Sequence, residues 1–179
     1  LFPARITSWK GQLEFIDVIK KIDTQNIFVL FAGDTKNESY TKLVRDKIKQ
    51  NNLDGVCKIL GSINQDEMRS LYEVADLSVS FPLRAEGFGR TVSESLYSKT
   101  PVLAFDYGGV KNQLANLSDM FKVKPQDFQV LPTKIEKLLS LSEVEKKEAL
   151  EGVQSVIESN FSKINMVKQY LKLYESFKS

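Results

Sequence analysis

Short, mainly apolar runs alternate with longer segments of helical periodicity through the first two thirds of this chain. The runs at 27–31, 56–60, 77–81 and 102–105 are typical of strands that are covered on both faces. In the segments between them, apolar residues recur every three or four positions, as at Leu13, Ile16 and Ile19, which predicts helices. Such alternation requires parallel strands joined by crossover helices. The sequence therefore predicts an α/β fold with a doubly wound parallel sheet.

Helices are expected at about 13–22, 39–51, 66–74 and 90–97, and two more at 142–159 and 162–177. No further strand is expected after about residue 124. Ser142 precedes Glu145 by three positions, which indicates a capping box, and the charged run 143–148 indicates a solvated helix face. A length of 179 residues suits one domain, 1–179, that ends in the C-terminal helices 142–179.

Composition excludes several kinds of chemistry. The chain has no histidine, so a Ser-His-Asp triad, a Cys-His pair and the usual zinc sites are not available within it. Its single cysteine, Cys57, lies in an apolar run, which predicts a buried strand residue in a protein of a reducing compartment. A net charge of +2 does not indicate nucleic acid as a partner, and no apolar run approaches the roughly 18–20 residues that span a bilayer.

The first residues, Leu1 to Ala4, resemble the end of a strand, and the chain has no initiator methionine. We therefore expect a fragment of a longer protein. No secretory signal is visible, so the expected location is the cytoplasm.

The loop and helix start at 82–94 are the richest candidate site. The segment leaves a predicted strand, passes Gly87 and Gly89, and enters a helix. Glycines allow a ligand to approach the backbone closely, and the free amides of a first helical turn, here Arg90 to Val92, favour a phosphate. Glu94 lies one turn into the helix, where its carboxylate could accept hydrogen bonds from the two hydroxyls of a ribose. Glu86 lies before the turn, at the mouth of the site.

Plainer readings of this segment exist. The two glutamates could be exposed carboxylates that serve only solubility. The pattern Gly87-x-Gly89-x-x-Val92 is a partial dinucleotide fingerprint that lacks its third glycine and does not lie in the first strand–helix unit. An NAD-linked protein is therefore disfavoured.

Arg5 and Lys10 form a second candidate, because they flank a turn that precedes a helix. Together they could neutralise a diphosphate from the side opposite the glycine loop. A pair of unit charges about 4 Å apart is worth roughly 4 kcal/mol at an effective dielectric near 20. The alternative is ordinary surface charge.

These motifs, with several others, occur in a familiar order. The chain resembles the C-terminal domain of group 1, or family 4, retaining glycosyltransferases of the GT-B architecture, and the resemblance covers essentially its whole length. The Glu-x7-Glu element is its most specific part. The motifs are Arg5…Lys10-Gly11, Phe31-Ala32-Gly33-Asp34, Leu60-Gly61, Leu71-Tyr72…Ala75-Asp76, Glu86-Gly87-Phe88-Gly89…Glu94, Pro101-Val102-Leu103-Ala104 and Gly108-Gly109.

The resemblance implies a Rossmann-like domain that binds a nucleoside-diphosphate sugar, while a missing N-terminal domain binds the acceptor. It implies sugar transfer with retention to a glycan or glycolipid in polysaccharide or cell-envelope synthesis. It implies no metal, no other cofactor and no nucleic acid as a partner. Peripheral association of the full-length protein with the inner face of the membrane is also compatible with it. The isolated fragment is expected to be inactive.

The resemblance also assigns roles to single residues. Arg5 and Lys10 would neutralise the diphosphate, and Glu86 would face the donor sugar; these three form the expected catalytic set. Glu94 would bind the ribose, and Ile63 would lie near the base. The expected substrate-binding set is Gly33, Gly61, Ile63, Gly87, Phe88, Gly89, Arg90, Thr91, Val92 and Glu94.

Some positions depart from the family pattern. Ala4 stands where the family usually has glycine, and Lys111-Asn112 stands where an acidic residue is common. The glycine-rich turn usual before the last strand is replaced by residues 117–120. Three alternatives stay open: another GT-B enzyme such as a nucleotide-sugar epimerase, a phosphorylase-like transferase, or a non-catalytic nucleotide-binding module.

Overall fold

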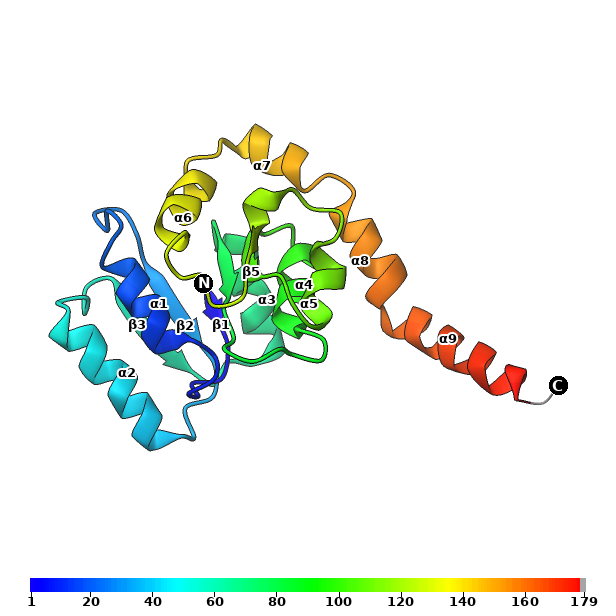
Figure 1. Ribbon diagram of the computed structural model, residues 1–179, viewed down its shortest axis with the longest axis horizontal. Helices are drawn as coiled ribbons and strands as arrows, with labels where there is room; N and C mark the ends of the chain where they lie inside the picture. The colour runs from blue at the N-terminus through cyan, green and yellow to red at the C-terminus, as the bar shows by residue number, and fades with distance from the viewer. Residues whose placement is uncertain (178–179) are drawn as a thin grey trace.

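Six short parallel strands form the centre of the computed structural model, which describes residues 1–177 (Figure 1). Their register defines two groups, ordered β1-β2-β3 and β4-β5-β6. The strands are β1 (Phe2–Pro3), β2 (Val29–Ala32), β3 (Cys57–Gly61), β4 (Ser78–Ser80), β5 (Val102–Phe105) and β6 (Lys122–Val123).

The two groups meet at β1 and β4. The amino group of Leu1 donates to the Leu77 carbonyl at 2.7 Å, and the Val79 amide donates to the Leu1 carbonyl at 2.9 Å. The spatial order is therefore β3-β2-β1-β4-β5-β6, which is the doubly wound Rossmann order. This confirms the predicted fold class. The predicted strand position of Cys57 is also confirmed, since the residue is buried on β3.

The helices that connect and flank these strands follow in chain order. A short 3₁₀ turn, Asp119–Phe121, precedes β6. The helices are α1 (Gln12–Ile19), α2 (Glu38–Gln50), α3 (Gln65–Val74), α4 (Arg90–Tyr97), α5 (Gly109–Leu114), α6 (Leu131–Leu139), α7 (Glu143–Ala149), α8 (Val153–Phe161) and α9 (Lys163–Ser176).

The prediction of one continuous helix at 142–159 was wrong. The segment forms two helices, α7 and α8, separated at Leu150 to Gly152. Gly152 has φ +73°, a left-handed conformation that interrupts a right-handed helix and that glycine adopts without strain. The capping box of Ser142 and Glu145 at the start of α7 is confirmed. The sequence interpretation also did not include α5 and α6.

Aromatic side chains fill the core beneath the junction of the two strand groups. Phe81, just after β4, packs against Phe2, Phe15 and Phe105 with ring centroids 5.2–6.5 Å apart. All four rings are buried. This cluster fixes the carboxyl ends of β1 and β4, where ligands bind in doubly wound sheets.

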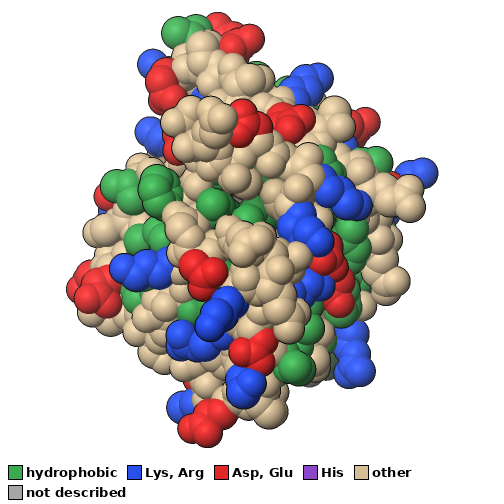
Figure 2. Space-filling view, turned by 90° about the vertical axis from the view of Figure 1, so that its left-hand side faces the viewer, with side chains coloured by type: hydrophobic (Ala, Val, Ile, Leu, Met, Phe, Trp, Pro, Cys, Tyr) green, Lys and Arg blue, Asp and Glu red, His purple; other side chains and the backbone are tan. Residues whose placement is uncertain are grey.

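The C-terminal helices leave the body of the molecule (Figure 1). α8 contacts α4 and buries Ile157, whereas no side chain of α9 is buried. Among the described residues, no helix is both long and apolar enough to cross a membrane. Figure 2 shows lysines and arginines interspersed with acidic residues on one side of the molecule, without a single basic patch on that face.

Candidate functional site

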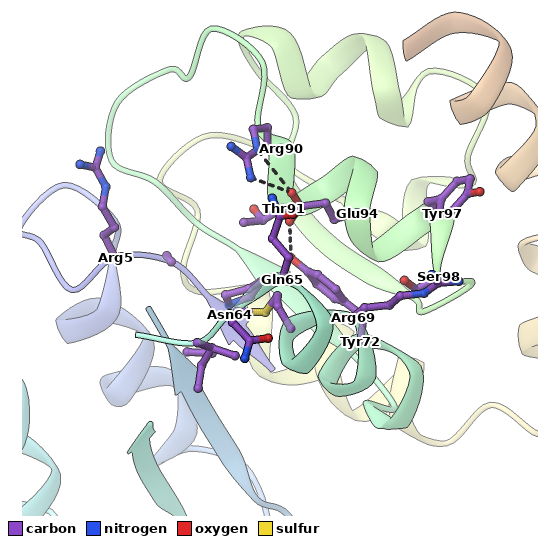
Figure 3. Close-up of a pocket in the computed structure, with 15 residues that line it drawn as sticks. Arg5, Asn64, Gln65, Arg69, Tyr72, Arg90, Thr91, Glu94, Tyr97 and Ser98 are labelled. Carbon is purple, nitrogen blue, oxygen red and sulfur yellow. Dashed lines mark hydrogen bonds and ion pairs between the residues drawn. The ribbon is translucent and has the colours of Figure 1, made fainter. Parts of the chain in front are cut away.

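A cavity of about 430 Å³ opens beside the carboxyl end of β1 (Figure 3). Residues of α3 and α4 line it, and the loop after β1 contributes its other side. One residue of the expected catalytic set, Arg5, lines this cavity, and so do four of the expected substrate-binding set: Ile63, Arg90, Thr91 and Glu94. The structure therefore brings together residues that lie up to 89 positions apart in the chain.

Glu94 is the acidic group of the cavity. Its Oε1 accepts from Arg90 Nη2 at 3.1 Å and Nε at 3.3 Å, and its Oε2 accepts from the Tyr72 hydroxyl at 3.1 Å. The Glu94 side chain is 39% exposed, so a ligand can reach the carboxylate. Burial, together with the charge of Glu94, raises the pKa of Tyr72, so its hydroxyl stays protonated and acts as a donor.

The start of α4 presents backbone donors to solvent. Among the described residues, the amides of Arg90 and Thr91 have no hydrogen-bond partner, as is usual for the first positions of a helix. The Val92 amide instead donates to the Gly89 carbonyl at 3.0 Å, and the Val92 side chain is fully buried. The anion-binding potential of this turn therefore lies mainly at Arg90 and Thr91.

Lys10 and Glu86 form an ion pair outside the cavity lining. Their side chains are only 13% and 12% exposed. The Lys10 ammonium also lies 4.3 Å from the centroid of the Trp9 ring, which adds a cation–π contact. Burial, with the charge of Glu86 as a second cause, raises the pKa of Tyr107, whose hydroxyl donates to the Pro82 carbonyl.

The glycine loop between these two sites is fixed by its neighbours. Gly89 has φ +79° and directly precedes α4, and a Cβ at this position would overlap the side chain of Val110. The Gly109 amide donates to the Glu86 carbonyl at 2.9 Å, and the Gln113 side chain donates to the Phe88 carbonyl. The loop is therefore anchored to both ends of the short helix α5.

The remaining expected residues are not among those that line the cavity. Gly33 packs directly beneath the Ala4 carbonyl, with no room for a Cβ. Gly61 adopts φ +82° at the end of β3, with open space around it. Gly87 and Phe88 belong to the anchored loop, and Phe88 packs on Phe161 of α8 at a centroid distance of 5.6 Å.

Sequence reasoning missed the contribution of α3. Gln65, Met68, Arg69 and Tyr72 all line the cavity. Their spacing of three or four positions places them on one face of α3, and this pattern was available in the sequence. Among the described residues, no group of three or more Cys, Asp or Glu side chains could hold a metal ion.

Known proteins share both sequence and structure with this chain. The family model of glycosyl transferases group 1 matches residues 1–151. Trehalose synthase of Thermococcus litoralis is 28% identical over 97% of this chain and 43% of its own length. A glycosyltransferase from Rickettsia africae has a TM-score of 0.88 at 28% identity, covering 98% of this chain and 46% of that one. HepE from Anabaena, solved with UDP and glucose, has a TM-score of 0.85 at 22% identity, covering 98% and 47%.

These relatives are all longer proteins, and this chain spans less than half the length of each. The parallel sheet and flanking helices match the C-terminal half of a GT-B glycosyltransferase in fold. The family model covers 151 of the 179 residues, including both glutamates and both candidate cations. The chain belongs to the glycosyl transferases of group 1.

Proposed function

We propose that this chain binds a nucleoside-diphosphate sugar and forms the donor half of a retaining glycosyltransferase of family 4. One observation carries the proposal: a single cavity brings the carboxylate of Glu94, the unpaired amides at the start of α4 and the cation of Arg5 to the carboxyl edge of the sheet. In this combination, the carboxylate suits a ribose, the amides suit a phosphate, and the cation suits an oxygen of a second phosphate. The Anabaena HepE structures with UDP and UDP-glucose support a donor of this class.

The nucleotide would bind with its ribose on Glu94 and its base toward Ile63. Its phosphates would lie between Arg5 and the amides of Arg90 and Thr91. The sugar would then extend toward the glycine loop and Glu86. Gly33 and Gly61 would border the nucleoside from below.

The chemistry follows from where charge develops. As the bond from the anomeric carbon to the diphosphate breaks, the sugar becomes cationic and the leaving diphosphate gains negative charge. Arg5 and Lys10 would stabilise the leaving group, which is a role that a metal takes in other enzymes. Glu86 would stabilise the sugar. The acceptor oxygen would bond to the anomeric carbon on the same face that the diphosphate leaves, and the proton of the acceptor hydroxyl would pass to an oxygen of the departing diphosphate. No metal or other cofactor is needed in this scheme.

The acceptor would bind to a part of the protein outside this chain. We therefore expect residues 1–179 alone to bind the donor without transferring its sugar. The acceptor class we favour is a glycan or glycolipid of a polysaccharide or cell-envelope pathway, with the full-length protein in the cytoplasm or at the inner membrane face. The single buried cysteine suits that reducing compartment.

A thermal-shift panel tests the donor site. The chain is melted with UDP-, GDP-, ADP- and TDP-sugars, in EDTA and in magnesium, because a ligand that binds only the folded state raises the melting temperature. We expect one base to raise it, equally in both buffers. Arg5→Ala should reduce the shift for the diphosphate while leaving any shift with the nucleoside unchanged.

The control for this panel is Lys42→Ala, which removes a cation of an exposed pair on α2, away from the cavity. It should behave as the unchanged chain. No shift with any of the four donors, or a shift that requires magnesium, would count against the proposal. Robust sugar transfer by residues 1–179 alone would show that these residues also bind the acceptor.

A further inference from the structure

Tyr72 belongs to α3 and contacts the carboxylate proposed to bind the ribose. The residue as a whole is 2% exposed, yet it lines the cavity and its hydroxyl donates to Glu94 Oε2 at 3.1 Å (Figure 3). Tyr72 belongs to neither the catalytic set nor the substrate-binding set proposed above. Its hydroxyl is nevertheless one of only two side-chain donors to Glu94 in the described residues.

The backbone of Tyr72 is itself fixed. The Thr100 hydroxyl donates to the Tyr72 carbonyl at 2.5 Å, and the Ala75 amide donates to the same carbonyl at 3.2 Å. Thr100 is in turn hydrogen-bonded to Ser95 near the end of α4. Its amide donates to the Ser95 carbonyl at 3.0 Å, and its carbonyl accepts from the Ser95 hydroxyl at 3.1 Å. These bonds connect α3 to α4, so the backbone of Tyr72 cannot move relative to α4 without breaking buried hydrogen bonds.

The two donors to Glu94 differ in mobility. Arg90 has a side chain that is 74% exposed, so it can leave Oε1 at little cost when a ligand arrives. Tyr72 is buried and cannot. A carboxylate that accepts from two neighbouring hydroxyls must present both oxygens in one orientation, and an unsupported carboxylate rotates about its last bond.

We propose that Tyr72 is a positioning residue for donor binding: its hydroxyl holds the Glu94 carboxylate in the orientation that accepts both ribose hydroxyls of the nucleotide. This inference rests on the proposed function, because it assumes that a ribonucleotide occupies the cavity. Tyr72 touches Glu94 rather than the ligand's reacting atoms, so it acts on affinity for the ribose and not on the chemical step.

The variant Tyr72→Phe removes the hydroxyl and keeps the buried ring. Calorimetry with UDP and with 2′,3′-dideoxy-UDP, or the same pair in the base that the panel selects, measures its effect. We expect Tyr72→Phe to weaken binding of the ribonucleotide about tenfold, because a hydrogen bond to a charged group is lost. Binding of the dideoxy analogue should stay within about twofold of the unchanged chain, since it has no diol to orient.

Two further variants isolate the cause. Tyr40→Phe removes another buried tyrosine hydroxyl, on α2 and outside the cavity, and should change neither affinity. In the background of Glu94→Gln, Tyr72→Phe should cause a much smaller additional loss, because the two residues act as one unit. The same comparison applies if Tyr72→Phe lowers the melting temperature, because a loss caused by instability alone would persist in the Glu94→Gln background.

The outcomes separate this inference from the proposed function. If the unchanged chain binds the ribonucleotide but Tyr72→Phe weakens both ligands equally, the residue has a structural role only and the inference is wrong. A full additional loss in the Glu94→Gln background would likewise overturn it. If the unchanged chain binds none of the four nucleotides, the proposed function itself fails.

Discussion

Glu86 and Glu94 are eight positions apart on one loop–helix segment, yet the structure places them in opposite surroundings. Glu86 pairs with Lys10, and both side chains are nearly buried. Glu94 faces the cavity and pairs with Arg90, whose side chain is 74% exposed. The first pair holds two charges in place. The second pair leaves the Glu94 carboxylate accessible to a ligand. The spacing of the two glutamates alone did not distinguish these two environments.

The surroundings also set how strongly each pair affects stability. Breaking a buried pair leaves one charge without a partner in a poorly solvated position, whereas an exposed pair exchanges its partner for water. Four substitutions test how the two pairs differ, two through stability and two through turnover or nucleotide binding, from the largest expected effect to the smallest.

Lys10→Ala should lower the free energy of unfolding by about 3 kcal/mol, because it leaves Glu86 almost buried and unpaired. Urea denaturation followed by circular dichroism measures the change. The double variant Lys10→Met with Glu86→Gln should recover most of the loss, since it removes both charges and keeps the volumes similar. A loss below about 1 kcal/mol would mean that the pair behaves as a solvated surface pair.

Glu86→Ala should reduce turnover of the full-length enzyme about 100-fold, which corresponds to about 2.7 kcal/mol of barrier. Its proposed contact strengthens only as the sugar becomes cationic, so affinity for the free nucleoside diphosphate should change little. Steady-state kinetics and calorimetry measure the two quantities. Glu86→Gln, which keeps an acceptor for Lys10, controls for stability. Lost nucleotide binding with intact turnover at saturation would reverse the assignment.

Glu94→Gln should weaken binding of the ribonucleotide about thirtyfold, or about 2 kcal/mol, because charge-assisted hydrogen bonds to the diol are lost. The same substitution should leave the 2′,3′-dideoxy analogue nearly unaffected. Calorimetry with both ligands gives the comparison directly. Equal losses would show that Glu94 acts on the protein rather than on the ribose.

Arg90→Ala should change the free energy of unfolding by less than about 0.5 kcal/mol, because its pair with Glu94 is solvent-exposed. Lys42→Ala on α2 is the matched control, since Lys42 also belongs to an exposed pair four residues apart, with Asp46. Thermal and urea melts of the two variants should coincide. A much larger effect of Arg90→Ala would mean that the Arg90–Glu94 pair contributes to stability as a buried pair does, like that of Lys10 and Glu86.

Much of the fold was predictable because hydrophobic periodicity reports burial directly. The strands around Val29, Cys57 and Val102, with the helices between them, appear close to their expected positions. The break at Gly152 was not anticipated, because a glycine within a helical pattern is compatible with either a continuous or an interrupted helix. α5 is only six residues long and follows two glycines, so its periodic signal is weak.

The membership of the cavity was predictable only in part, because five of the thirteen predicted site residues line it. Parallel topology sends Arg5 and Glu94 to one edge of the sheet, and both line the cavity. The pairing of Lys10 with Glu86 depends on how the loops after β1 and β4 fold against each other, and spacing does not encode that. The role of Tyr72 depends on the packing angle of α3 on α4, which likewise has no local signal. The roles assigned to single residues stay predictions.

The anchored glycine loop also determines where this protein can change. A Cβ at Gly109 would collide with the backbone of the loop at Gly87 and Phe88, and one at Gly108 would collide with the Glu86 carbonyl. A side chain at either of these two glycines therefore requires the facing backbone of the loop to move. Gln65 and Arg69 on the cavity-facing side of α3 have no such constraint, because both are exposed. A library intended to retune the proposed donor preference should therefore diversify Gln65 and Arg69 and leave Tyr72, the loop and the glycines that face it unchanged.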